Sequence, residues 1–416
     1  MGFFEVSSIL ITLAAVFSFI NFRYIRLPST IGVMLIALIA SLLALIVGEW
    51  WPAARHIAAE IVNGIDFNRA LLHGMLAFLL FAGALHVDLG DLVEQWVPVT
   101  LLALLGTAMS TVIVGGLMRL ALYWLGSDIS TIDCMLFGAL ISPTDPVAVL
   151  SIMKSVGAPK RLETQLAAES LFNDGVGVVI FMTLLSIALD HTRSPTVAGV
   201  TGLFLQQAGG GLALGMVCGM ITYQLLRRVD HYQLEVLLTL ALAMGGYALA
   251  DELHVSAPIA AVVSGLFIGN RGRAFAMSDT TRVNLDLFWE LIDETLNVVL
   301  FMLVGLEILS MPFIGRWHAA IAIAVIVTLA ARWFSVAMVV GSIRRRRPLH
   351  RGTITVLTWG GLRGGISVAM ALSLPPGPHR GIIIAMTYGV VVFSILVQGV
   401  TIGKVVQRVV TTEAPA

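Results

Sequence analysis

Three acidic residues fall inside long apolar stretches of the chain, where an ionised side chain is costly. They are Asp145, Glu169 and Asp174. A carboxylate in hydrocarbon persists when it pairs with a cationic group, takes up a proton or binds a cation. Residues of this kind therefore mark ion or proton pathways, and their spacing indicates which task each one performs.

Asp145 lies in the run Ser-Pro-Thr-Asp-Pro, between two prolines. Because proline has no N–H, Pro143 and Pro146 leave the carbonyl groups of Ala139 and Ser142 without helical partners. We expect the helix to unwind at this point. Freed carbonyl oxygens beside a carboxylate form a cation site. The alternative is a structural kink whose acid pairs with a neighbouring helix.

The other two acids belong to one helix, in the run Glu-Ser-Leu-Phe-Asn-Asp-Gly. At 3.6 residues per turn, Ser170 and Asp174 share one face, while Glu169 and Asn173 share a face rotated by about 100°. We expect Ser170 and Asp174 to reach an ion at the proline break. Glu169 should point at another helix, where Arg363 is its predicted partner in a structural ion pair. Direct ligation of the ion by Glu169 is the alternative.

Arg363 itself lies in the run Trp-Gly-Gly-Leu-Arg-Gly-Gly. Four glycines around one arginine in an apolar stretch predict a second interrupted helix. This helix comes seven spans after the first, so the two cross the membrane in opposite directions. That arrangement is typical of inverted repeats whose binding site lies where two interrupted helices meet.

Composition places these residues in a membrane protein. Of 416 residues, 58% are hydrophobic and 12% charged, and the mean hydropathy is +0.93, which is outside the range of soluble globular domains. The net charge of +0 gives no basic excess for nucleic acid. A bilayer core takes about 20 helical residues, which predicts an all-α integral membrane protein of about thirteen transmembrane helices. They are 6–22, 30–47, 71–87, 97–125, 135–153, 166–189, 200–226, 236–250, 257–268, 287–309, 319–340, 354–374 and 382–402.

The basic residues provide a test of these spans, because Lys and Arg gather in cytoplasmic loops. With thirteen spans, 17 of the 25 Lys and Arg residues fall on one side and 5 on the other. We therefore predict a multi-pass protein of a bacterial or archaeal inner membrane, with the N-terminus outside and the C-terminus in the cytoplasm. The longest stretch between spans, 48–70, is predicted as an interfacial amphipathic helix or a simple loop, so residues 1–416 form one transmembrane unit without a soluble domain.

Two further clusters carry weaker signals. Glycines at 209–211, 215 and 219 are predicted to let helices pack closely rather than to bind a nucleotide. Glu290, Asp293 and Glu294, near the cytoplasmic start of the span 287–309, either attract cations or form a solvated helix end.

Four motifs, in this order along nearly the whole chain, resemble the sodium/proton antiporters of the NhaP/NHE type. They are Thr144-Asp145-Pro146, Glu169-Ser170 with Asn173-Asp174, Phe288-Trp289 with Phe301 and Gly305-Leu306-Glu307, and Gly361-Leu362-Arg363-Gly364. The resemblance implies a transporter rather than an enzyme, with a NhaA-like fold and no bound cofactor. It also implies a homodimer in which a core domain, with helices around 71–189 and 287–402, moves against a dimerisation domain made of the remaining helices.

The resemblance also assigns roles in the site. It makes Asp174 the carboxylate that exchanges a proton for a cation. Na⁺ would be held by Asp174, Asp145, Ser170 and the carbonyl of Thr144, and Asn173 would orient the site.

Glu169 and Arg363 correspond to the structural ion pair of the family. The chain departs from many relatives at one position, because they carry an acid after the phenylalanine of the third span and this chain has Ala82. That difference bears on ion choice, affinity and pH dependence.

A single carboxylate that takes either a cation or a proton predicts exchange by alternating access. Because Asn173 stands beside Asp174 in place of a second carboxylate, we predict one proton per monovalent cation and no net charge moved. Sodium is the predicted cation and lithium a further substrate. A potassium/proton antiporter is the alternative, and a cation channel is the rival class. Membrane lipid and a second copy of the chain complete the expected partners.

Overall fold

The structure is a computed structural model that describes residues 3–50, 74–189, 197–310, 317–344 and 352–411. Within these ranges the secondary structure is helical, apart from one isolated β-bridge between Asp145 and Leu362. The predicted all-α class is therefore confirmed. Most of the predicted interfacial loop at 48–70, and the first residues of the third span, lie outside the described residues.

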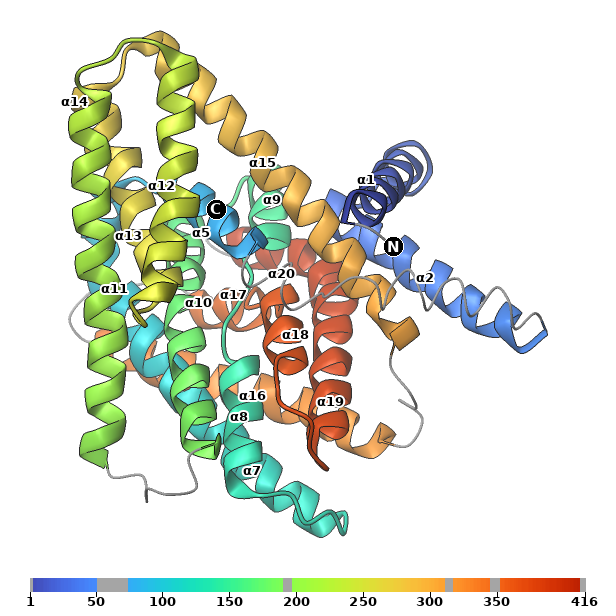
Figure 1. Cartoon of the computed structure of the whole chain (residues 1–416). Helices are drawn as coiled ribbons and strands as arrows, with labels where there is room; N and C mark the ends of the chain where they lie inside the picture. Colours follow the sequence, from blue (N-terminus) through green and yellow to red (C-terminus); the bar gives the residue numbers. More distant parts are fainter. Residues whose placement is uncertain (1–2, 51–73, 190–196, 311–316, 345–351, 412–416) are drawn as a thin grey trace.

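Each predicted span contains a helix, and eight helical segments within the described ranges are long and apolar enough to cross a membrane. Figure 1 shows their arrangement. In chain order the α-helices are α1 (Phe3–Ile20), α2 (Ser29–Trp50), α5 (Leu76–Leu85), α6 (Leu89–Leu101), α7 (Thr107–Trp124), α8 (Thr131–Ile141), α9 (Val147–Ser155), α10 (Lys160–Leu189), α11 (Val197–Leu226), α12 (Tyr232–Glu252), α13 (Ala257–Phe267), α14 (Arg273–Ala276), α15 (Asp279–Leu306), α16 (His318–Arg344), α17 (Thr353–Trp359), α18 (Gly365–Leu372), α19 (Arg380–Phe393) and α20 (Val400–Thr411).

Side-chain caps fix where four of these helices begin. The side-chain oxygens of Asp88, Ser130, Ser256 and Ser278 accept backbone N–H groups from the first turns of α6, α8, α13 and α15, respectively. These caps satisfy donors that a helix start leaves unpaired. These four helices thus begin at polar residues.

The helices pack in two neighbouring groups. In one, α11 lies against α13, α13 against α5, and α2 against α15, whereas in the other α7, α8, α10, α16 and α19 pack together. The predicted glycine packing is confirmed on α11, because a Cβ on Gly211 would lie 2.5 Å from the carbonyl oxygen of Ser256. A Cβ on Gly215 would similarly lie 2.6 Å from that of Ala260 on α13. Small residues therefore bring these two backbones close together.

Both predicted interruptions are present, and they meet. The chain is non-helical at 142–146, between α8 and α9, and again at 360–364, between α17 and α18. The two extended segments run antiparallel, and the N–H of Asp145 donates to the carbonyl of Leu362 at 2.8 Å. This backbone bond joins the two interrupted helices, whose parts α9, α17 and α18 lie near the middle of the molecule in Figure 1.

Candidate functional site

The guanidinium of Arg363 ties the two interrupted helices together. Its Nη1 donates to the carbonyl oxygens of Ser142 and Pro143 at 2.8 and 2.9 Å, and its backbone N–H donates to Ser394 Oγ at 2.9 Å. The carbonyl of Ala139 accepts the N–H of Ser142 in a tighter turn. Both carbonyls that the prolines free therefore accept a hydrogen bond within the protein.

The predicted pairing of Glu169 with Arg363 is wrong. The partner of Glu169 is Arg332 on α16, whose Nη1 lies 2.5 Å from Glu169 Oε1, and both side chains are buried. The remaining donors of Arg332 reach the carbonyl of Leu357. Gly361 permits this approach, because a Cβ there would lie 2.8 Å from Arg332 Nε.

The correction has a physical reason. Arg363 is bound to the carbonyls of α8's end, whereas α16 runs uninterrupted past α10 and presents Arg332 to Glu169. Linear spacing cannot choose between two arginines on different spans. The available signal was that Arg332 is the lone charged residue in its apolar span, and a buried charge requires a partner.

The polar residues of α10 meet the first interruption as their spacing predicts. Ser170 Oγ and Thr144 Oγ1 are 2.9 Å apart, and Asn173 Nδ2 donates to Thr144 Oγ1 at 2.8 Å. Asn173 Oδ1 also accepts the N–H of Thr144 at 3.4 Å. Asn173 therefore holds the non-helical segment against α10 by bonding to both the backbone and the side chain of Thr144.

Asp174 and Asp145 line a shared cavity of about 360 Å³. Asp174 is 8% exposed, and none of the described residues forms a hydrogen bond or ion pair with its carboxylate. It lies close enough to Asp145 and Arg363 to interact with their charges. Asp145 accepts the N–H of Val147 at 3.0 Å. Gly364 is required here, because a Cβ would lie 2.2 Å from Asp145 Oδ2.

The wall of the cavity carries further polar groups from α9 and α15. Lys154, Asp293 and Asn297 line it together with the two site acids. Asn297 was missed by the sequence reasoning, although it follows Asp293 by one helical turn on the same face of the helix. Both residues therefore belong to the same cavity as the two site acids.

The departure at Ala82 has a structural context. Ala82 is fully buried in α5 and packs in an apolar cluster with Phe81, Leu85 and Trp289. The next residue, Gly83, lines the cavity instead. The position that the resemblance associates with an acid is thus an apolar packing position in this chain.

The arrangement suits the reversible binding of a small cation or a proton. Asp145 and Asp174 line one cavity, the hydroxyls of Ser170 and Thr144, which do not line it, bond to each other on the same two elements, and the guanidinium of Arg363 is occupied with carbonyl groups. Hydroxyl, carbonyl and carboxylate oxygens are the ligands that hard cations prefer.

Comparisons with known proteins agree with this geometry. The profile of the family described as "Sodium/hydrogen exchanger, transmembrane" matches residues 9–408. The chain is 50% identical over 406 residues to the Na(+)/H(+) antiporter NhaP of Pseudomonas aeruginosa, covering 96% of this chain and 95% of that protein. It is 34% identical to the Na(+)/H(+) antiporter NhaH of Halobacillus dabanensis, covering 98% of each.

The fold has a solved counterpart. The structure of the sodium proton antiporter MjNhaP1 from Methanocaldococcus jannaschii matches with a TM-score of 0.75 at 18% identity, covering 97% of each chain. That likeness establishes the architecture, while the profile and the relatives establish the family. The chain is therefore a multi-pass membrane transporter, not an enzyme, and it belongs to the sodium/hydrogen exchanger family of antiporters.

Proposed function

We propose that this chain exchanges one sodium ion for one proton by alternating access, at a site built around Asp174. The observation that carries the proposal is the buried Asp174 carboxylate, which has no partner among the described residues and lines the same cavity as Asp145. An acid in this position is costly when it is ionised and alone. A proton or a cation removes that cost, and only one of them is bound at a time.

The cation ligands proposed are Asp174, Asp145, Ser170 Oγ and the carbonyl of Thr144. The hydrogen bonds around Thr144 support this set. Thr144 Oγ1 accepts from Asn173, and when Ser170 donates to the same oxygen the lone pairs of Ser170 are left for the cation. Asn173 then positions both hydroxyls without entering the coordination shell.

The proposed stoichiometry follows from charge. With sodium bound, the Asp174 site carries the same net charge as with a proton bound, so both loaded forms can cross and the empty ionised form is held back. Asn173 supplies no second titrating group. Exchange is therefore expected to be electroneutral, and lithium, with the same charge and a smaller radius, is a further substrate.

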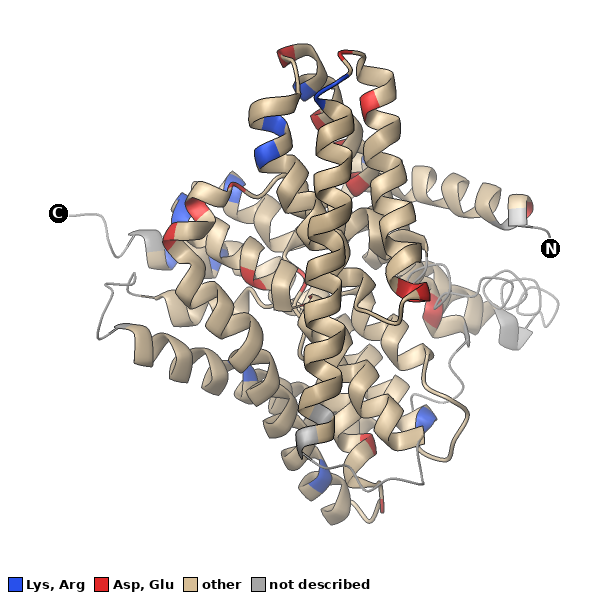
Figure 2. Ribbon diagram, turned by 60° about the vertical axis from the view of Figure 1, so that its left-hand side comes forward, with Lys and Arg blue, Asp and Glu red and all other residues tan. Residues whose placement is uncertain are grey.

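The cavity is proposed to face the cytoplasm. Lys154, at the end of α9, lines it, and it belongs to the side with the predicted excess of basic residues. Figure 2 supports that sidedness, since more of the described Lys and Arg lie toward the end of the molecule where α14 is found than toward the other end. An N-terminus outside, a C-terminus inside and a bacterial or archaeal inner membrane are part of the proposal.

Alternating access requires a moving part and a fixed part. We assign the interrupted helices with α10 and α16 to the moving core, because Arg363, Arg332 and Asn173 bind them into one hydrogen-bonded unit. The other helices within 71–189 and 287–402 would complete the core, and the helices outside these ranges would serve the dimer contact. In a homodimer, the dimerisation domains of the two chains would together form the fixed part against which each core moves.

One assay tests the proposal. The purified chain is placed in liposomes with an internal pH dye, and sodium, lithium and potassium are added in turn. Sodium should drive proton movement, and an imposed membrane potential should leave its rate unchanged. In the acidic range the half-saturating sodium concentration should rise about tenfold per pH unit, as competition for one site requires. Potassium as the preferred ion would favour the potassium/proton alternative, and cation flux without proton movement would favour a channel.

A further inference from the structure

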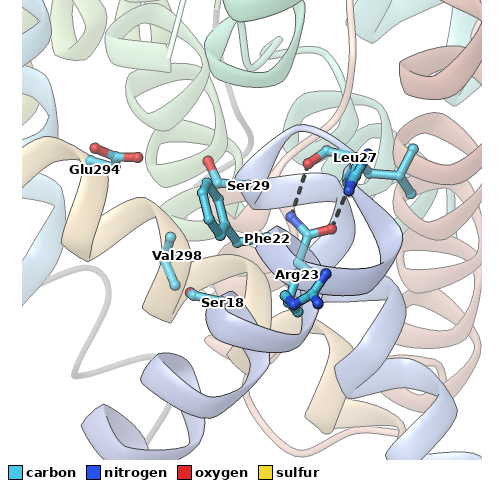
Figure 3. A pocket seen from close by; sticks show the side chains of 9 residues that line it. Ser18, Phe22, Arg23, Leu27, Ser29, Glu294 and Val298 are labelled. Carbon is cyan, nitrogen blue, oxygen red and sulfur yellow. Dashed lines mark hydrogen bonds between the residues drawn. The ribbon is translucent and has the colours of Figure 1, made fainter.

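A second hollow lies outside the transport site. It is a groove of about 690 Å³ where α1 ends and α2 begins, bordered by α15. Figure 3 shows Arg23 on one side of it and Glu294 on the other, with Phe22 and Ser29 between them. Among the described residues, none lines both this groove and the cavity that holds Asp174. The groove is therefore a separate feature, and ion exchange does not explain it.

The turn that presents the basic side of the groove is firmly built. Buried Asn21 donates from Nδ2 to the carbonyl of Leu27 at 2.9 Å and accepts the N–H of Leu27 at 3.3 Å. Arg26 adopts a left-handed backbone with φ 61°, which non-glycine residues rarely do. Gly32 leaves room for Asn21, because a Cβ would lie 2.0 Å from its Oδ1. Local contacts between residues 21, 27 and 32 therefore fix a strained turn, as is common at binding sites.

The arginines of this turn have unused donors. Arg23 and Arg26 are both exposed, and no carboxylate of the described residues lies within ion-pairing distance of either guanidinium. A planar guanidinium group can donate two parallel hydrogen bonds to the oxygens of one phosphate, and arginine is prominent in phosphate recognition. Two of them on one wall of a groove form a suitable place for a phosphate group.

The opposite wall has the complementary charge. Glu294 is an exposed carboxylate on α15, and a carboxylate would repel a bare phosphate that entered the groove. It would instead attract a cationic group carried by the same ligand. The groove therefore fits a headgroup with a phosphate at one end and an ammonium at the other.

The surroundings of the groove are apolar. Phe19 on α1 is 63% exposed and Phe22, in the π-helical turn Asn21–Ile25 that follows, is 83% exposed, and Val298 lines the groove one turn beyond Glu294 on α15. Exposed aromatic and aliphatic side chains next to arginines are typical of the zone where a helix leaves the bilayer. Acyl chains attached to the headgroup would lie along these residues.

We propose that this groove binds the headgroup of a phosphatidylethanolamine molecule, with its phosphate on Arg23 and Arg26 and its ammonium on Glu294. The primary ammonium donates hydrogen bonds to a carboxylate, which the methylated ammonium of phosphatidylcholine cannot do. Phosphatidylglycerol has no cation for Glu294. The three headgroups should therefore bind in the order ethanolamine, then glycerol and choline.

Native mass spectrometry of the full-length, delipidated protein tests the proposal. Phosphatidylethanolamine, phosphatidylglycerol and phosphatidylcholine are titrated separately, and the fraction of chains retaining one lipid is measured. Phosphatidylethanolamine should bind at least about fivefold more tightly than the other two. The double variant Arg23→Gln, Arg26→Gln should reduce its binding about tenfold, consistent with the loss of two charge-assisted contacts. Arg227→Gln, Arg228→Gln is the matched control, an exposed arginine pair at the end of α11, and it should leave binding unchanged.

A single variant separates the two ends of the headgroup. Glu294→Gln should remove the preference for phosphatidylethanolamine over phosphatidylglycerol and keep the dependence on Arg23 and Arg26. Inorganic phosphate at millimolar concentration should compete weakly. The proposal is overturned if the arginine pair has no more effect than its control, if Glu294→Gln leaves the preference intact, or if inorganic phosphate displaces the lipid at equal concentration. All variants concern exposed side chains, and size-exclusion profiles report whether each one is folded.

Discussion

Two carboxylates on α10, five residues apart, have opposite surroundings. Glu169 is 1% exposed and bound to Arg332, whereas Asp174 is 8% exposed, lines a cavity and has no partner among the described residues. Both are acids deep in a membrane protein, and both lie near the same crossing of interrupted helices. Their chemical type therefore does not explain the difference between them.

The difference is which face of the helix each acid occupies. Residues 169 and 174 lie about 140° apart around α10, so one faces the continuous helix α16 and the other faces the cavity beside α15 and α5. A buried charge with a guanidinium partner is fixed in one state, and removing either partner is costly. A buried charge facing a cavity can change state as protons and cations arrive, and this is the property a carrier requires.

The largest expected effect comes from removing the exchangeable acid. Asp174→Asn keeps the volume of the side chain and removes its charge and its titration, so sodium-driven proton movement in liposomes should fall to the level of empty vesicles. The folded protein should remain, because a neutral amide is less costly in this place than a carboxylate. Asp279→Asn, at a site 96% exposed, is the control and should transport normally. Residual exchange in Asp174→Asn would remove this residue from its role.

The second effect is on stability and concerns the paired acid. Arg332→Ala leaves Glu169 as an unpartnered buried charge, which should cost about 3 to 5 kcal/mol and lower the thermal unfolding temperature in detergent. Arg119→Ala, which breaks an exposed pair with Asp128, should change it little. Adding Glu169→Gln to Arg332→Ala should restore part of the loss. If the double variant were no more stable than Arg332→Ala, the buried charge would not be the cause.

The sequence was sufficient for features that depend on local rules. Prolines around Asp145 and glycines around Arg363 predicted both interruptions, and the helical period separated Ser170 from Glu169. The partner of Glu169 could not be predicted, because the choice between Arg332 and Arg363 depends on how distant helices pack. The close approach of the Asp145 side chain to Gly364 could not be predicted either, because the residues around Gly364 do not indicate which distant side chain will contact it.

A third effect tests the crossing itself. Gly364→Ala would place a Cβ 2.2 Å from Asp145 Oδ2, so the carboxylate must move away from its present position. Misplacing a binding group by about 1 Å has a large effect on function, and we expect the half-saturating sodium concentration to rise about tenfold or more. Gly116→Ala on α7, where a Cβ would meet nothing within 4 Å, is the control. Equal affinities in the two variants would mean that Asp145 is not a ligand.

The smallest effect distinguishes a cation ligand from a structural hydroxyl. Ser170→Ala removes one neutral oxygen next to Thr144 but leaves both carboxylates, so the half-saturating sodium concentration should rise about threefold to tenfold, the equivalent of one neutral hydrogen bond. The maximal exchange rate should change less. Ser186→Ala is a matched control on the same helix, where the hydroxyl bonds only to the carbonyl of Thr183. If both variants lowered thermal stability alike and neither changed sodium affinity, Ser170 would serve the packing of α10 against the interruption, and the cation would be held by the carboxylates and the backbone.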